Sequence, residues 1–168
     1  AGRRARTRST ASAQAPATLI RNVNVVTLDE RGTLTGAALL IEDGKIARIL
    51  KPGEPLPSAA ATIDGTGKYV IPGLVDAHIH IDRPESLPDY LRHGVTTVFS
   101  LGTRDEHRAE LNALLTAQKA GKVAGATIYA TGPSVGNHRR IETVAEVQPF
   151  LDELQRDGLT FVKVYNAI

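Results

Sequence analysis

The stretch 69–80 (YVIPGLVDAHIH) constrains the fold of this chain more than any other segment. An apolar run passes through a Pro-Gly turn, resumes as Leu-Val and ends in a His-x-His motif. Because side chains alternate between the two faces of a strand, His78 and His80 are expected on one face together with Asp76. Neutral imidazoles suit Zn, Fe, Ni or Cu. The two histidines are therefore either a metal-binding pair or two unrelated polar residues leaving a strand.

A second candidate for chemistry is Lys163, in the segment FVKVY at 161–165. Because side chains alternate between the two faces of a strand, Lys163 is expected on the same face as Phe161 and Tyr165. There it would point into a barrel or cleft. A charged lysine is rarely buried without a partner, so Lys163 can simply extend to solvent or pair with an acid. Alternatively, its amine reacts with CO2 to form a carbamate, which suits two metal ions about 3.5–4 Å apart.

Residues 18–71 have the pattern of a small all-β unit. The first segment, TLIRNVNVVT, is rich in β-branched residues and partly alternating. Asp43-Gly44 between two apolar runs is a strong signal for a two-residue hairpin turn. Strands are therefore expected at 18–27, 37–42, 45–50, 61–64 and 68–71.

After Pro72 the pattern changes to alternating strands and helices, which predicts a parallel sheet with right-handed crossovers. Thr143 and Glu146 form a capping box at the start of the last helix, and Gly94 closes the first. The expected strands are 74–78, 95–100, 126–130 and 160–165, and the expected helices are 85–93, 105–120 and 143–156. This α/β pattern is the first half of a (β/α)8 TIM barrel, which needs about 250 residues. A separate doubly wound sheet is the structural alternative.

These patterns divide the chain into a basic leader at 1–16, a β unit at 17–71 that forms part of a composite sandwich, and a truncated barrel at 72–168. The leader lacks hydrophobic periodicity and is expected to be disordered. Its Arg3-Arg4 pair resembles a twin-arginine export signal, although the apolar region of a signal peptide is absent. A periplasmic or secreted location is expected, with the cytoplasm as the alternative. Because the chain contains no Met, we expect it to be trimmed, processed or cut from a longer protein.

Composition excludes several kinds of site and partner. The chain has no Cys, which rules out disulfides and thiolate ligands. Four of its 20 Lys and Arg residues lie in the leader. The rest of the chain therefore has 16 basic and 18 acidic residues. The body is therefore mildly acidic, which argues against a nucleic-acid partner. No apolar run is long enough to predict a membrane span.

Four segments together resemble the N-terminal part of the amidohydrolase superfamily, especially its prolidase-like and imidazolonepropionase-like branches. They are IDGTGKYVIPGLVDAHIHID at 63–82, HGVTTV at 93–98, IYATGPSV at 128–135 and FVKVYN at 161–166. The first and last segments are fairly specific together, while the middle two are weaker. The resemblance extends over residues 18–168.

The resemblance implies roles for three residues. His78 and His80 would hold the more buried metal, most simply Zn, and a carbamylated Lys163 would bridge to a second. The family takes two further histidines and a general-base aspartate from later barrel strands that this chain does not contain. The catalytic residue is therefore expected outside this chain, and Asp76 is expected to make a structural hydrogen bond instead.

The remaining histidines and their neighbours are weaker candidates. His138 lies in the loop after the third barrel strand, where it would either contact substrate or be solvated. Arg139 and Arg140 follow it and would either bind a substrate carboxylate or be solvated. His93 is expected to serve a helix dipole and His107 to lie at the surface.

The leading functional hypothesis is the N-terminal part of a metal-dependent amidohydrolase. It would hydrolyse an amide, cyclic amide or related C–N bond of a small molecule through a metal-activated water. The alternative is a non-catalytic scaffold or assembly subunit that keeps the half-barrel. In either case the expected partner is the remainder of the barrel, a second chain or another copy of this chain.

Overall fold

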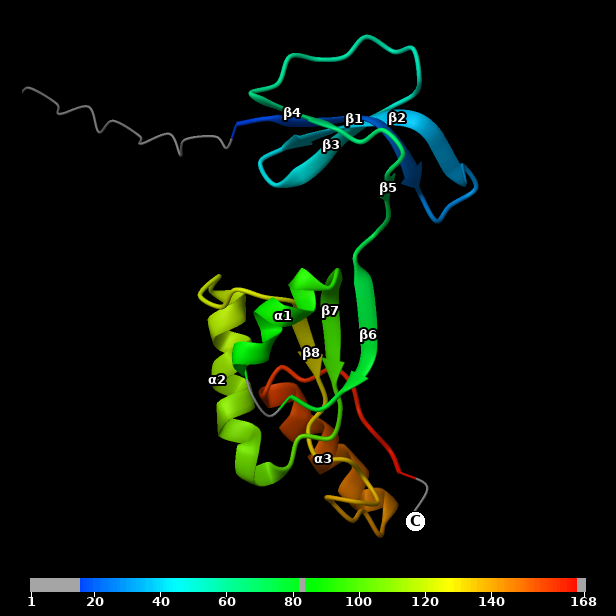
Figure 1. Ribbon diagram of the computed structural model, residues 1–168. Helices are drawn as coiled ribbons and strands as arrows, with labels where there is room; N and C mark the ends of the chain where they lie inside the picture. Colours follow the sequence, from blue (N-terminus) through cyan, green and yellow to red (C-terminus); the bar gives the residue numbers. More distant parts are fainter. Residues whose placement is uncertain (1–15, 82–83, 166–168) are drawn as a thin grey trace, which may run out of the picture. The chain divides into compact units, whose positions relative to one another are not determined.

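The computed structural model describes residues 16–81 and 84–165 as two compact units that divide between Pro72 and Gly73 (Figure 1). The disorder expected of the leader falls, apart from Pro16, outside the described residues. No helix in the described part of the chain is long and apolar enough to cross a membrane.

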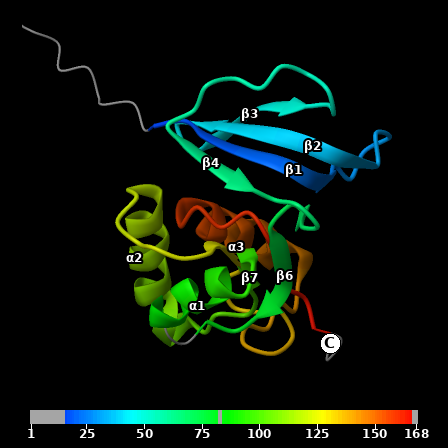
Figure 2. The ribbon, with the colours of Figure 1, turned by 45° about the horizontal axis from the view of Figure 1, so that its top comes forward.

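The first unit is a single five-stranded sheet with β1 at its centre (Figure 2). Its strands are β1 Thr18–Val26, β2 Thr33–Glu42, β3 Lys45–Leu50, β4 Ala61–Asp64 and β5 Tyr69–Val70. Strand β2 pairs antiparallel with β1 and β3, whereas β4 and β5 pair parallel with β1. Because both short strands extend the sheet beside β1, the described residues of this unit form a single sheet.

The predicted hairpin turn is confirmed. Asp43 and Gly44 both have positive φ, 50° and 71°, which a two-residue hairpin turn requires at its central positions. Successive residues of β2 point to opposite faces of the sheet, and both faces bury apolar side chains. Leu40 packs with Leu19 and Leu50 in one cluster, and Leu39 packs with Val23 in the other.

The second unit is built on three parallel strands in the order β6-β7-β8. These strands are β6 Leu74–Ile79, β7 Val95–Ser100 and β8 Thr127–Ala130. The helical segments are η1 Pro84–Ser86, α1 Leu87–Arg92, η2 Asp105–His107, α2 Arg108–Lys119 and α3 Val144–Arg156. At the start of α3 the Glu146 carboxylate accepts hydrogen bonds from the backbone N–H groups of Glu142 and Thr143, as the capping box predicts.

The two faces of this sheet differ in what covers them. Buried Val98 and Ile128 pack against Leu87 of α1, Leu111 of α2 and Phe150 of α3, so the helices cover one face (Figure 1). On the other face, the rings of Phe99 and Tyr129 stack at 5.2 Å, and Phe161 meets Phe99 edge-on at 5.3 Å. Because Tyr129 and Phe161 stay more than 40% exposed, this face is only partly covered, as in an incomplete barrel.

The predicted fourth strand is only partly formed. Residues 160–165 make two isolated parallel bridges, Thr131 with Phe161 and Val135 with Val164. Gly132, Pro133 and Ser134 lie between the two bridging positions, and Pro133 has no N–H to donate to a ladder. The segment that carries Lys163 is therefore tied to the loop after β8 instead of continuing the sheet.

Candidate functional site

The three metal ligands expected from the sequence lie close together. Lys163 Nζ is 3.2 Å from His78 Nε2, although 85 residues separate them. The His78 and His80 rings are 5.3 Å apart between centroids, at an interplanar angle of 66°. Because an ammonium group only donates, His78 Nε2 accepts this hydrogen bond.

Strand β6 presents the two histidines at its carboxyl end. Ile79 between them is buried in the helix-covered core, so His78 and His80 are turned away from that core. The register of β6 against β7 shifts between Asp76 and Ile79, where β6 carries one extra residue. The Asp76 carboxylate accepts the backbone N–H of His78 at 3.2 Å, a structural hydrogen bond within this irregular stretch.

Lys163 is held through its backbone as well as its side chain. Its carbonyl accepts the N–H of Val135 at 2.9 Å, and the N–H of Tyr165 donates to the Val135 carbonyl at 2.8 Å. Lys163 Nζ also lies 5.0 Å from the centroid of the Tyr165 ring, a cation–π distance. The loop after β8 therefore holds the backbone of Lys163, while its amine contacts the Tyr165 ring and His78.

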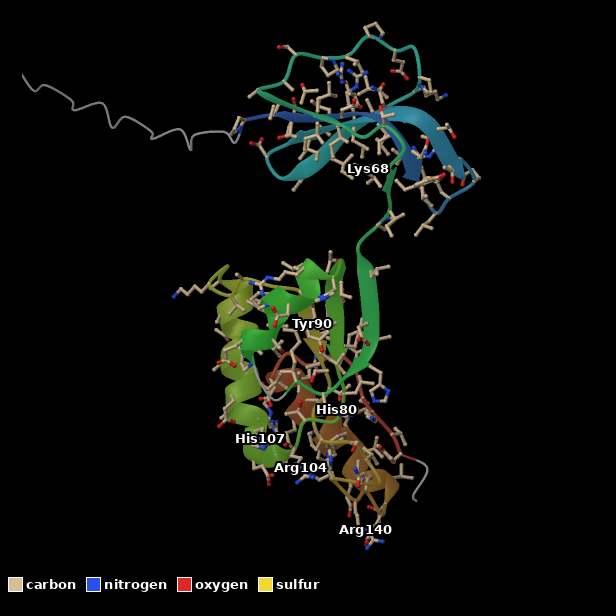
Figure 3. The ribbon with its side chains drawn as sticks, viewed as in Figure 1. Lys68, His80, Tyr90, Arg104, His107 and Arg140 are labelled. Atoms are coloured by element: carbon tan, nitrogen blue, oxygen red, sulfur yellow. The ribbon has the colours of Figure 1, made fainter. Side chains whose placement is uncertain are left out.

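A cavity of about 550 Å³ opens beside this group. Figure 3 shows three of its lining residues, His80, Arg104 and His107, at the end of the sheet where the β6 and β7 arrows end. Lys163 and His138 also line it, whereas His78 does not line it but contacts two residues that do, Lys163 and His80. Ligands of parallel α/β folds bind at this carboxyl end of the strands.

Gly102, just after β7, lies close to side chains from two other segments of the chain, the loop after β8 and the segment that carries Lys163. A Cβ built there would lie 3.5 Å from His138 Cε1, 3.6 Å from Lys163 Cδ and 3.7 Å from Ser134 Oγ. His138 Nδ1 is 3.2 Å from Ser134 Oγ. The sequence-predicted substrate contact His138 is thus brought to the same cavity as Lys163.

Two side-chain hydroxyl groups accept backbone hydrogen bonds at the strand ends next to the cavity. Ser100 Oγ accepts the N–H of Ile81 at 3.1 Å, and Thr131 Oγ1 accepts the N–H of Gly102 at 2.7 Å. Ser100 and Thr131 are both about 2% exposed. These hydroxyls satisfy backbone donors where the ladder ends, which is a structural role.

Arg139, which the sequence offered as a solvated or substrate-binding residue, binds carboxylates of this chain while its side chain stays 31% exposed. Its guanidinium binds Asp105 at 2.8 Å and Glu153 at 3.1 Å. Arg108 of α2 contacts Glu153 of α3 and Asp157, the C-cap residue of α3, in the same network. Hydrogen bonds from Arg139 and then Arg108 lower the pKa of Glu153 from 4.5 to about 2.

The other histidines lie where the sequence suggests. His93 is the C-cap of α1, and its Nδ1–H donates to the Asp89 carbonyl at 2.9 Å. The side chain of His107 is 68% exposed, although it also lines the cavity. Cavity lining by His107 and Arg104 was not expected from the sequence.

The donor set fits part of a metal site. Among the described residues, no group of three or more His, Asp or Glu side chains is arranged to hold an ion. Two imidazoles and one amine are nevertheless assembled at the carboxyl end of the sheet, and imidazole is a ligand for Zn, Cu, Fe and Ni. On their own, the described residues therefore offer at most part of a donor set for an ion.

No family model matches the chain, but individual proteins do. An imidazolonepropionase from Saccharopolyspora erythraea is 33% identical over 135 residues, which cover 71% of this chain and 34% of that protein. An adenine deaminase from Clostridium perfringens is 39% identical over 85 residues, 48% of this chain and 15% of that protein. The chain therefore spans about a third or less of these relatives.

Solved structures agree on the fold. The match with a Xaa-Pro dipeptidase carrying bound methionine in its active site has a TM-score of 0.65 and 20% identity, and covers 88% of this chain and 46% of that one. Sequence relatives and structural neighbours point to the amidohydrolase superfamily. The superfamily's barrel is consistent with the half-barrel seen here, so the predicted fold class is confirmed. The relatives are hydrolases that act on amide or other C–N bonds, and members of the superfamily depend on metals.

Sequence reasoning missed Ser134 and the Arg139–Glu153 network. Ser134 is fully buried and contacts His138 four residues later. The spacing of a serine four residues before a loop histidine was visible in the sequence. The ion pairs were not, because Arg139 and Glu153 lie on separate elements whose packing no local pattern specifies.

Proposed function

We propose that this chain is the N-terminal part of a metal-dependent amidohydrolase that hydrolyses an amide, cyclic amide or related C–N bond of a small molecule. In this proposal His78 and His80 hold one divalent ion, most simply Zn, and Lys163 bridges to a second as a carbamate. The observation that carries the proposal is the 3.2 Å approach of Lys163 Nζ to His78 Nε2, at the carboxyl end of β6.

The assignment of Lys163 rests on charge as well as distance. A lysine amine 3.2 Å from the His78 imidazole adds a cation where a metal would sit, which is unfavourable unless its charge changes. Reaction of the neutral amine with CO2 forms an N–C bond, releases one proton and leaves a carbamate anion. The product has two oxygens, so it can contact two ions at once. The aliphatic stem of Lys163 passes Gly102, where an added Cβ would lie 3.6 Å from Lys163 Cδ.

A divalent ion at this site would polarise the scissile carbonyl and lower the pKa of water bound to it. The chain's own residues would orient the reactants. The hydrogen bond from the His78 N–H to Asp76 fixes the backbone that carries the ligand. The cavity beside Lys163 would take the substrate, and His138 would contact it.

The proposal includes a partner and a location. The remaining ligands and the general base would come from the rest of the barrel, either in a longer form of this protein or in a second chain. The partly covered face with Tyr129 and Phe161 supports such an association. The arginine pair in the leader supports a periplasmic or secreted location.

The first test is the metal content of the purified chain after equilibration with zinc and removal of free ion. We expect bound zinc in the wild type and its loss in His78→Ala and His80→Ala. His93→Ala is the matched control, because it removes an exposed histidine on the same unit but outside the cavity. Equal zinc in all four proteins would reject the assignment of the ligands.

The second test addresses the reaction. The zinc-loaded chain, alone and with the rest of the barrel supplied, is assayed on N-acetyl amino acids, dipeptides and cyclic amides. Release of product that depends on His78 would support hydrolysis. Zinc binding without turnover of any of these amides in the completed barrel would favour the scaffold alternative.

A further inference from the structure

The cavity beside Lys163 has an apolar side, to which α2 contributes. Its apolar lining residues come from three segments of the unit and are Ile81, Pro84, Leu101, Leu111 and Leu114. Leu111 and Leu114 are only 5% and 8% exposed, and they belong to the core that the helices form with the β6-β7-β8 sheet. On this side the cavity is therefore bounded by the hydrophobic core of the unit.

The residues that α2 and its N-cap contribute to the cavity change in polarity along the helix. His107, Glu110, Leu111 and Leu114 all line the cavity, and steps of three and four residues place them on one helix face. The His107 side chain, next to the start of α2 in Figure 3, is 68% exposed, and Glu110 is exposed as well. The two leucines are buried. This face of α2 therefore leads from a polar rim to an apolar wall.

Polar groups of the strand ends near the apolar wall already have partners within the chain. Ser100 Oγ accepts the N–H of Ile81 at 3.1 Å, and the N–H of Gly102 donates to Thr131 Oγ1 at 2.7 Å. Both Ser100 and Gly102 line the cavity. Since these groups are paired, a ligand gains more here by burying apolar surface than by offering a further polar group.

The apolar wall and the candidate metal ligands share one cavity. His80 and Lys163 line it together with Leu111 and Leu114. Its volume of about 550 Å³ lies within the range of roughly 300–1,000 Å³ that is typical of small-molecule sites. A molecule whose amide group lies beside His80 and Lys163 can therefore extend a substituent toward α2.

We propose that this wall is a subsite for an extended aliphatic substituent of the substrate, and that Leu114 is a specificity-determining residue in it. The inference deepens the proposed function and rests on it for the amide group. It assigns the substrate class as amides that carry an unbranched alkyl chain. The wall consists of uncharged side chains, so its preference is the same whether Lys163 is an ammonium or a carbamate.

The subsite is tested with three neutral probes, N-ethylacetamide, N-propylacetamide and N-butylacetamide, titrated into the metal-free chain labelled with 13C at its Ile and Leu methyl groups. Each added methylene should tighten binding about fourfold, the ratio expected when one CH2 group is buried. The butyl protons should show nuclear Overhauser effects to the methyl groups of Leu111 and Leu114. Equal affinity for the three probes, or contacts to other methyl groups only, would overturn the proposal.

A variant that fills the apolar side supplies the second test. Leu114→Phe adds volume at the wall and should weaken binding of N-butylacetamide at least about tenfold, because the alkyl chain and the ring compete for the same space. Ala113→Phe is the matched control, since residue 113 is exposed on the same helix and does not line the cavity. Unchanged binding to a folded Leu114→Phe would reject the subsite. Should that variant not fold, the wild-type Overhauser contacts decide.

The same probes separate this inference from the proposed function. Chain-length-dependent binding with contacts to Leu111 and Leu114, but no amide hydrolysis in the completed barrel, would support the subsite and reject the function. Hydrolysis of the three amides at equal kcat/KM, without those contacts, would support the function and reject the subsite.

Discussion

Arg139 donates to the Glu153 carboxylate, with 3.1 Å between Nη1 and Oε2, and so joins the loop after β8 to α3. The same guanidinium binds both Asp105 oxygens, at 2.8 and 2.9 Å. Because Arg139 follows His138 directly, this pair also determines where the cavity-lining histidine lies. The stability of the unit and the shape of the cavity therefore depend on the same contact.

Replacement of Glu153 by Gln should lower the free energy of unfolding at pH 7 by about 1.5–3 kcal/mol, because Arg139 and Arg108 lose a charged acceptor. The measurement is denaturant unfolding, followed by circular dichroism. Glu142→Gln is the control, since that side chain is exposed and only its backbone N–H takes part in the cap of α3. Similar losses in both variants would show that the network does not stabilise the unit.

This stabilisation should depend on pH in a defined window. The arginines lower the pKa of Glu153 from 4.5 to about 2, so the folded state favours the ionised carboxylate. Stability from this group is fully present above pH 4.5 and is lost as the pH falls through about 2. The difference in unfolding free energy between wild type and Glu153→Gln should shrink over that range. A difference that stays constant from pH 5 to pH 2 would contradict the assignment.

Gly125 should not accept a side chain. Its φ is 134°, and an added Cβ would lie 2.5 Å from Leu87 Cβ and 2.6 Å from the Leu87 backbone carbon. Gly125→Ala should therefore cost about 1–3 kcal/mol more than Gly121→Ala, because Gly121 has a positive φ of 67° but no atom nearby. Thermal unfolding of both variants measures the difference, and equal midpoints would mean that the approach to Leu87 is not close.

Leu87 should be the most sensitive position in α1. It is fully buried, and its carbonyl accepts the N–H of Ala126 at 3.1 Å. Truncation of a buried leucine to alanine costs about 2–5 kcal/mol. Leu91→Ala, on the same helix but 45% exposed, should cost much less. A comparable loss of stability in both variants would argue against the packing of α1 on the sheet.

Removal of the Lys163 amine should affect the second metal more than the first. Lys163→Ala leaves both imidazoles in place, so we expect one ion to be retained and the bridged ion to be lost. Elemental analysis of the completed barrel measures both. Lys122→Ala is the control, because that lysine is exposed in the turn after α2. Full two-ion occupancy in Lys163→Ala would exclude a bridging role.

Local patterns predicted most elements of this chain correctly. The hairpin at Asp43-Gly44 and the capping box at Glu146 depend on a few neighbouring residues, and the structure contains both. The prediction was only partly right for 160–165, where β propensity indicated a continuous strand and the structure has two isolated parallel bridges. The segment that pairs with it contains Pro133, about 30 positions earlier in the chain. The pattern of residues within 160–165 gives no information on that partner.

The sequence alone determined which chemistry is possible here. It supplies two imidazoles at spacing two and a lysine in an apolar segment, and it excludes thiolates because there is no Cys. Only the tertiary structure decided which of these groups meet. The 3.2 Å contact between His78 and Lys163, the pairing of Ser134 with His138 and the capture of Arg139 by Glu153 all follow from how loops and helices pack at the strand ends. The physical reason is that residue type and local period act over a few positions, whereas long-range contacts depend on the packing of the whole unit.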